Sequence, residues 1–250
     1  MPKLLDLNAD LETQKLPTGN FSFSGTRIAD LGATEYTLAT LVVDVSGSTE
    51  PFRPEMEKCL KAVLEACKYS PRADNLMLRL LIFSKDLQEI HGFKLLQNCN
   101  AADYDNVLNV PGSMTALCDA SVNGVEATAV YGKDLTRQDF ACNGIVIVIT
   151  DGVENHSTFT VNTLNQKLRE AISGENLESL VSILVGINVS DPQVQKCLKD
   201  FSAAAGFTQY VDAGEASAKK LAKLAEFVSK SISSQSQSLG SGGPSQPLQF

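Results

Sequence analysis

The chain contains 250 residues with an apolar content of 43%, which suffices to bury the core of one large domain. Acidic residues outnumber basic ones by 29 to 21 and no basic run occurs, so we expect neither nucleic acid nor a membrane as a partner. The first residues lack the apolar core of a signal peptide, and no apolar stretch approaches the length of a membrane span, so we expect a soluble, cytoplasmic protein.

The cysteines are scattered along the chain and form no C-x-x-C pair: Cys59, Cys67, Cys99, Cys118, Cys142 and Cys197. This spacing argues against a zinc site and against a redox motif. We expect most of them to be buried thiols in a reducing compartment.

Residues 1–36 are polar and turn-rich and form an N-terminal extension, in which Phe21–Ser24 alternates like a short strand that could cover an edge of a sheet. From Leu38 onward, apolar runs alternate with helical periods. The predicted strands are 38–43, 76–83, 87–91, 144–149, 179–186 and 207–211, and the predicted helices are 53–69, 116–130, 160–172, 191–204 and 216–232.

This alternation predicts an α/β fold, a Rossmann-like doubly wound and mainly parallel six-stranded sheet with helices on both faces. Residues 83–86 are too few for a crossover helix, so strand 87–91 is predicted to be a short antiparallel strand at the edge.

Residues 234–250 are rich in Ser, Gln, Gly and Pro and carry no charge, which is typical of a flexible tail.

Two apolar strands of this predicted sheet each run into an aspartate. The first leads into Asp44-x-Ser46-x-Ser48, and the strand 144–149 leads into Asp151. In a doubly wound sheet of strand order 3-2-1-4-5-6, these two strands are neighbours, and ligands bind at their carboxyl ends. Carboxylates held so close are costly unless a cation lies between them. With Thr115 on the long loop after residue 92, the set offers only hard oxygen ligands, which suit Mg²⁺.

The five residues Asp44, Ser46, Ser48, Thr115 and Asp151 match the metal-ion-dependent adhesion site of von Willebrand factor A domains. The resemblance covers about residues 37–233, and within that family the chain looks like stand-alone bacterial cytoplasmic members such as tellurite-resistance-associated proteins. It implies that Ser46, Ser48 and Thr115 contact Mg²⁺ directly and that the two aspartates do so directly or through water. A Glu or Asp carboxylate of a partner protein would complete the coordination. It also implies a scaffolding or regulatory role without catalysis, in which an AAA+ ATPase, kinase or phosphatase system is a candidate partner.

Other interpretations stay open at this point. Any one of the five residues taken alone would more simply cap a helix or satisfy a turn, and the metal could serve only to hold loops together. Mn²⁺ or Ca²⁺ fits the same oxygens, although the few carboxylates favour Mg²⁺. A haloacid-dehalogenase-like phosphohydrolase also begins with an aspartate after its first strand, but its second aspartate is replaced here by Ser46. No nucleophile elbow and no P-loop occur.

Several further polar residues lie near the predicted site in sequence. Asp119, four residues after Thr115, is expected to orient the metal ligands or to cap its helix. His156 could touch a ligand, although a solvated loop histidine is the simpler interpretation, and His91 is expected on the surface. The remaining rim candidates are Glu50, Met114 and Asn155.

Overall fold

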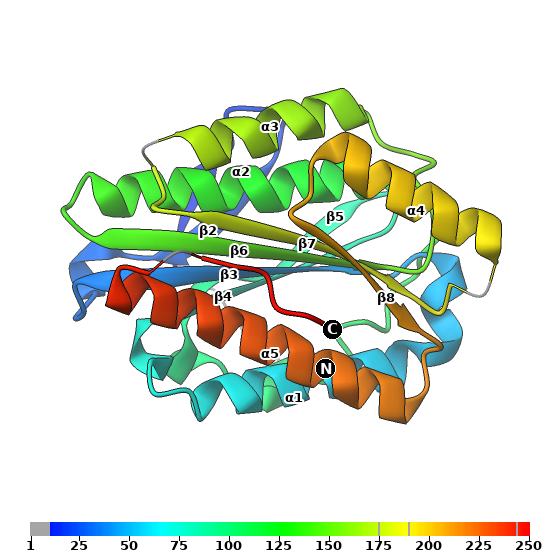
Figure 1. Cartoon of the computed structure of the whole chain (residues 1–250), viewed down its shortest axis with the longest axis horizontal. Coiled ribbons are helices and arrows are strands. Elements are labelled where there is room, and N and C mark those ends of the chain that lie inside the picture. The colour runs from blue at the N-terminus through cyan, green and yellow to red at the C-terminus, as the bar shows by residue number, and fades with distance from the viewer. Residues whose placement is uncertain (1–10, 175, 190, 244) are drawn as a thin grey trace, which may run out of the picture.

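One eight-stranded sheet forms the centre of the computed structural model, which describes residues 11–174, 176–189, 191–243 and 245–250 (Figure 1). The strands are β1 Leu11–Lys15, β2 Ser22–Thr26, β3 Glu35–Asp44, β4 Leu76–Phe83, β5 Leu87–Leu95, β6 Ala141–Thr150, β7 Leu180–Ile187 and β8 Gln209–Gly214. Their order across the sheet is β1-β2-β5-β4-β3-β6-β7-β8. Strands β4, β3, β6, β7 and β8 are mutually parallel, which confirms the predicted α/β class and the strand order around β3.

Helices cover both faces of this sheet. They are α1 Arg53–Lys68, α2 Leu117–Thr136, α3 Val161–Ser173, α4 Pro192–Ala205 and α5 Ala218–Ser241. Helices α1 and α5 pack on one face, and α2, α3 and α4 lie on the other, as Figure 1 shows. The protein is therefore a three-layer α/β sandwich with a core on each side of the sheet.

Strand β3 is apolar on both faces because it lies in the middle of the sandwich. Leu41 and Val43 belong to the core under α1 and α5, whereas Leu38 and Val42 belong to the core under α2. All four are fully buried. A continuous run of aliphatic residues is what a central parallel strand requires, and this is why the sequence predicts it well.

The sheet has two strands more than predicted, because the N-terminal extension contributes the hairpin β1–β2. Strand β5 pairs antiparallel with β4 as expected, but the sheet continues past it through β2, so β5 is not the outermost strand. The strand predicted around Phe21–Ser24 thus covers the edge. Gly92 makes this close pairing feasible, since a Cβ atom there would overlap the carbonyl group of Ser24. Residues 1–10 lie outside the described residues.

The last helix is longer than predicted. Helix α5 ends at Ser241, so residues 234–241, which we assigned to a flexible tail, are helical. Tertiary contacts explain the difference. The buried Gln235 side chain donates to the carbonyl of Gly144 at 3.2 Å and to Ser179 Oγ at 2.9 Å, and the backbone carbonyl of Gln235 accepts from the Asn143 side chain at 2.8 Å. The serines and the glycine of this segment are poor indicators of a helix because their intrinsic helix preference is modest or low.

Residues 245–250 are also packed rather than free. The ring of Phe250 lies edge-on to that of Phe227 with 5.4 Å between centroids, and the Gln209 side chain donates to the carbonyl of Leu248 at 3.0 Å. None of the helices in the described part of the chain has the length and apolarity needed to cross a membrane.

Candidate functional site

The five predicted ligands lie at the carboxyl end of the sheet, on the loops that follow β3 and β6 and just before α2. Strands β3 and β6 are parallel neighbours in register from Glu35 and Ala141 up to Val43 and Ile149. Asp44 is therefore the last residue of β3, and Asp151 directly follows β6. Two parallel strands that end together bring both loops to one point.

Asp44 is buried completely, and both of its oxygens accept hydrogen bonds. The backbone N–H of Ser46 donates to Oδ1 at 2.7 Å, and the hydroxyl of Thr150 donates to Oδ2 at 2.5 Å. Burial raises the pKa of Asp44 to about 6, the bonds from Thr150 and Ser46 oppose this rise, and the charge of Asp151 adds to it. The site therefore holds a carboxylate that lacks a compensating positive charge.

A chain of hydroxyl contacts joins the two loops. Ser46 Oγ lies 3.2 Å from Ser48 Oγ, and Ser48 Oγ donates to Asp151 Oδ1 at 2.8 Å. Burial raises the pKa of Asp151, while the bond from Ser48 and the charge of Arg53 lower it. Four of the five predicted residues are thus contiguous.

Thr115 is attached to the Asp151 loop through its backbone. Its N–H donates to Asn155 Oδ1 at 2.8 Å, and the N–H of Asn155 donates to the carbonyl of Thr115 at 3.1 Å. Thr115 Oγ1 would lie 3.5 Å from a Cβ atom placed on Gly152, so this hydroxyl faces the residue after Asp151. Asn155, predicted as a rim residue, is a positioning residue for Thr115.

Sequence reasoning missed Arg53, which fastens two of the loops together. Its guanidinium donates to the carbonyls of Val45 at 2.5 Å, Ser46 at 2.9 Å and Val110 at 2.7 Å. Its side chain is buried, so its positive charge interacts with backbone carbonyls beneath the Ser46–Ser48 turn and not with solvent. An arginine in the first turn of a helix, nine residues after a strand aspartate, gives no signal of this role by itself.

Two acidic residues organise the loop after Asp151. Glu154 accepts hydrogen bonds from the N–H of Cys118 at 2.7 Å and from the hydroxyl of Ser157 at 2.6 Å; burial opposes this ionisation, but these bonds lower the pKa of Glu154. Asp119 accepts from the N–H groups of Thr158 at 3.0 Å and Phe159 at 2.8 Å. Asp119 therefore anchors this loop and does not contact a proposed metal ligand, and sequence reasoning did not single out Glu154.

The remaining residues singled out near the site differ in their exposure to solvent. Glu50, Met114 and His156 are exposed on the loops beside the site. His91 was wrongly expected on the surface: it is buried, its Nε2 lies 2.9 Å from the Tyr104 hydroxyl, and burial lowers its pKa to about 4. The Tyr104 ring stacks on this histidine with 5.6 Å between ring centroids, and so covers it.

The donor chemistry suits a hard cation. Among the residues that the structure describes, no group of three or more His, Cys, Asp and Glu side chains is arranged to hold a metal ion. The site instead combines two carboxylates with hydroxyl groups, the oxygen ligands that Mg²⁺ accepts together with water. A divalent cation would also offset the repulsion between Asp44 and Asp151.

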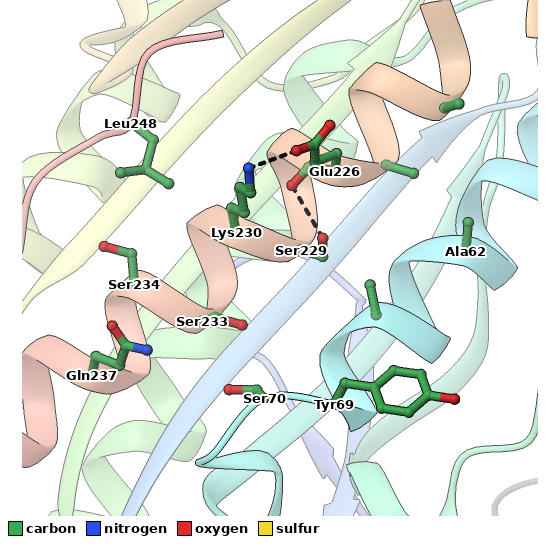
Figure 2. Close-up of a pocket in the computed structure, with 13 residues that line it drawn as sticks. Ala62, Tyr69, Ser70, Glu226, Ser229, Lys230, Ser233, Ser234, Gln237 and Leu248 are labelled. Atoms are coloured by element: carbon green, nitrogen blue, oxygen red, sulfur yellow. Dashed lines mark hydrogen bonds and ion pairs between the residues drawn. The ribbon is translucent and has the colours of Figure 1, made fainter. Parts of the chain in front are cut away.

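A groove of about 740 Å³ lies elsewhere, between α1 and α5 (Figure 2). Small side chains such as Ala62 and Ser229 line it, with Tyr69 at its border and Leu248 of the C-terminal segment at its edge. It is formed by the second half of α1, whereas the candidate site adjoins the start of that helix. We therefore place the candidate metal site on the loops and not in this groove.

No protein-family model matches the sequence, and neither does any curated protein. Solved structures do match. A D319A mutant of the PilB minor pilin from Streptococcus sanguinis aligns with a TM-score of 0.62 and 14% identity over 90% of this chain and 67% of that one. A von Willebrand factor type A protein from Catenulispora acidiphila aligns with a TM-score of 0.57 and 12% identity over 85% of this chain and 44% of that one. The chain has a von Willebrand factor A-like fold.

A third similar structure is that of proximal thread matrix protein 1 from the mussel byssus, described with a zinc-occupied MIDAS motif. It aligns with a TM-score of 0.53 and 17% identity over 81% of this chain and 47% of that one. The chain thus spans less than half the length of two of these three structures. At these identities the likeness concerns the fold, and ligands and partners have to be argued from the residues of this chain.

Proposed function

We propose that this protein binds a divalent cation, Mg²⁺ in the first place, and through it a carboxylate of a partner protein. Ser46, Ser48 and Thr115 would hold the ion by their hydroxyls, with Asp44 and Asp151 acting directly or through water. The observation that carries the proposal is the bond from Ser48 Oγ to Asp151 Oδ1, which joins the loops of β3 and β6 around a buried carboxylate.

The charge balance explains why a partner carboxylate is the proposed ligand. Both oxygens of Asp44 already accept hydrogen bonds, and Asp151 accepts one from Ser48, so the protein presents hydroxyls and only two anions. A bound divalent cation keeps positions for water or for a further anionic oxygen. The hard oxygen set favours Mg²⁺ over softer ions, although Mn²⁺ and Ca²⁺ use the same ligands.

An interaction role is favoured over catalysis. In a phosphohydrolase of the haloacid dehalogenase type, a second aspartate would serve as general acid two residues after the first, and Ser46 occupies that position. A site that captures a carboxylate needs neither a nucleophile nor a base. The main alternative is a metal ion that only holds the loops together. It is supported by the position of Ser48, which lies between the two loops.

The cytoplasmic location and the partner stay predictions. Two of the similar structures are named as a minor pilin and a pilus adhesin, and those are properties of those proteins. For this chain we retain a cytoplasmic scaffold or regulator as the proposal, with an AAA+ ATPase, kinase or phosphatase system as a candidate partner.

Affinity capture from a native lysate tests this function, with the wild type in Mg²⁺, the wild type in EDTA, and Ser48→Ala in Mg²⁺. Ser48 is exposed, so its loss should leave the fold intact. Ser113→Ala, another exposed loop serine near the site, is the matched control. We expect proteins retained by the wild type and by the control only in Mg²⁺. Identical capture under all conditions would instead point to a metal that merely holds the loops.

A further inference from the structure

An exposed apolar side chain stands next to one of the proposed ligands. Among the described residues, the large apolar side chains classed as exposed are Tyr69, Met114 and Ile172, with 87%, 48% and 51% of their surface accessible. Tyr69 follows the end of α1 and Ile172 lies near the end of α3, at the amino end of the parallel strands and away from the site. Met114 directly precedes Thr115, so its Cα atom lies about 3.8 Å from that of the proposed ligand.

The backbone around Met114 is fixed although its side chain faces solvent. Arg53 holds the carbonyl of Val110 at 2.7 Å, and Gly112 packs so closely on Val45 that a Cβ atom would overlap the Val45 carbonyl. On the other side, Thr115 is held by Asn155. An apolar group on a fixed backbone loses little conformational freedom when a partner covers it.

The electrostatics of the rim restrict what can approach Met114. Glu50 is exposed beside the site, and Asp151 lies within it. Arg53 donates to backbone carbonyls, and Lys85, which is exposed, lies 3.6 Å from Asp86. A partner segment with several acidic residues would therefore meet like charge once its first carboxylate is bound.

We propose that the ligand of this site is a peptide segment with one acidic residue for the ion and an apolar residue directly beside it, which packs on Met114. The proposal rests on the metal-dependent capture proposed above and adds the sequence class of the partner. Met114 directly precedes Thr115, so a residue next to the bound carboxylate is the one that would reach its side chain. Methionine suits this contact because its unbranched thioether adapts to differently shaped apolar groups.

Three short synthetic peptides provide the test: one glutamate flanked by two leucines, the same glutamate flanked by two serines, and the leucine peptide with glutamine in place of glutamate. Binding to the full chain is followed by NMR of the methionine ε-methyl groups, in Mg²⁺ and in EDTA, and Mg²⁺ affinity is measured separately by calorimetry. Met56 and Met77 are buried and act as internal controls. The variants are Met114→Ser, Met114→Leu and, as the matched control, Ile172→Ser.

We expect the Met114 methyl signal to shift with the leucine peptide in Mg²⁺ only, and affinity about tenfold higher than for the serine peptide. Met114→Ser should abolish this preference without changing Mg²⁺ affinity, whereas Met114→Leu and Ile172→Ser should keep it. Equal binding of the leucine and serine peptides, or no Met114 shift in a protein that binds Mg²⁺, overturns the inference alone. A wild type that binds no divalent cation overturns the proposed function as well.

Discussion

At the scale of single residues, the candidate site depends on Asp44, a carboxylate whose side chain is fully buried. Thr150 and Ser46 bind its two oxygens, and they are what keeps an ionised group tolerable inside the sandwich. Hydrogen bonds to a buried charged group contribute more than those between neutral groups, because the alternative is an unsolvated charge. Thr150 is therefore as much a part of the site as the residues proposed to touch the ion.

Replacing Thr150 by valine keeps the shape of the side chain and removes the donor to Asp44. We expect Thr150→Val to lower the free energy of unfolding of the metal-free protein by about 1–3 kcal/mol. It should weaken Mg²⁺ binding by about 10- to 100-fold, as the loss of a group that orients a ligand does. Urea unfolding in EDTA and calorimetric Mg²⁺ titration measure the two effects. Thr150→Ser retains the hydroxyl and should resemble the wild type; unchanged Mg²⁺ affinity in Thr150→Val would show that Asp44 takes no part.

At the scale of elements, three loops from different parts of the chain have to be locked together. Arg53 and Gly112 join two of them, the turn after β3 and the loop before α2. Gly112 lies against Val45 without any side chain between them, so this junction tolerates no extra atom.

Adding one methyl group at Gly112 tests that junction. The new Cβ atom would overlap the Val45 carbonyl and press on Arg53, so we expect Gly112→Ala to cost about 1–3 kcal/mol of stability. Mg²⁺ affinity should fall as well, because Thr115 lies three residues further along the displaced loop. Gly32→Ala is the control, since no atom lies within 4 Å of its Cβ position. Equal behaviour of the two variants in thermal unfolding and Mg²⁺ titration would contradict this role.

The last turns of α5 depend on Gln235 rather than on their own helix preference. Gln235→Ala removes the bonds to Gly144 and Ser179, so amide hydrogen exchange of residues 236–241 should become faster. Gln237 is exposed on the same helix, and Gln237→Ala should leave the exchange unchanged. Unaltered protection in Gln235→Ala would mean that apolar contacts such as that of Leu239 suffice.

At the scale of the whole molecule, the metal should couple stability to pH. The pKa of Asp44 is about 6 in the metal-free folded state, above the ordinary value of 3.8, so the folded protein binds more protons than the unfolded chain between these limits. Stability of the metal-free protein from this group is therefore lost as pH rises through about 6. Mg²⁺ needs the ionised carboxylate, so its affinity should change in the opposite direction.

We expect Mg²⁺ to bind about tenfold more weakly near pH 5 than near pH 7. The difference in melting temperature between Mg²⁺ and EDTA should accordingly grow over that range. Differential scanning fluorimetry across pH measures it, and a difference that is constant with pH would contradict the role of Asp44.

The sequence predicts the centre of this molecule better than its periphery. Strand β3 and the order β5-β4-β3-β6-β7-β8 follow from apolar runs alternating with helical periods, and the Asp44–Ser48 turn is local in sequence. The burial of His91 and the helical state of residues 234–241 were missed because each depends on contacts with another segment: Tyr104 covers His91, and β6 holds Gln235.

The same limit applies to the site. The proximity of Asp44 and Asp151 could be predicted because neighbouring parallel strands bring them together. The roles of Arg53 and Glu154 could not be predicted, because most of their hydrogen bonds go to backbone groups, which every residue has.

Calorimetric titration of the wild type, Ser48→Ala and Ser113→Ala with Mg²⁺ tests the central claim most directly. A single Mg²⁺ ion per chain should bind to the wild type and to Ser113→Ala, and Ser48→Ala should bind it at least about tenfold more weakly, because the link between the two loops is lost. Binding of equal strength in all three proteins, or no binding to the wild type, would contradict a metal site at the ends of β3 and β6.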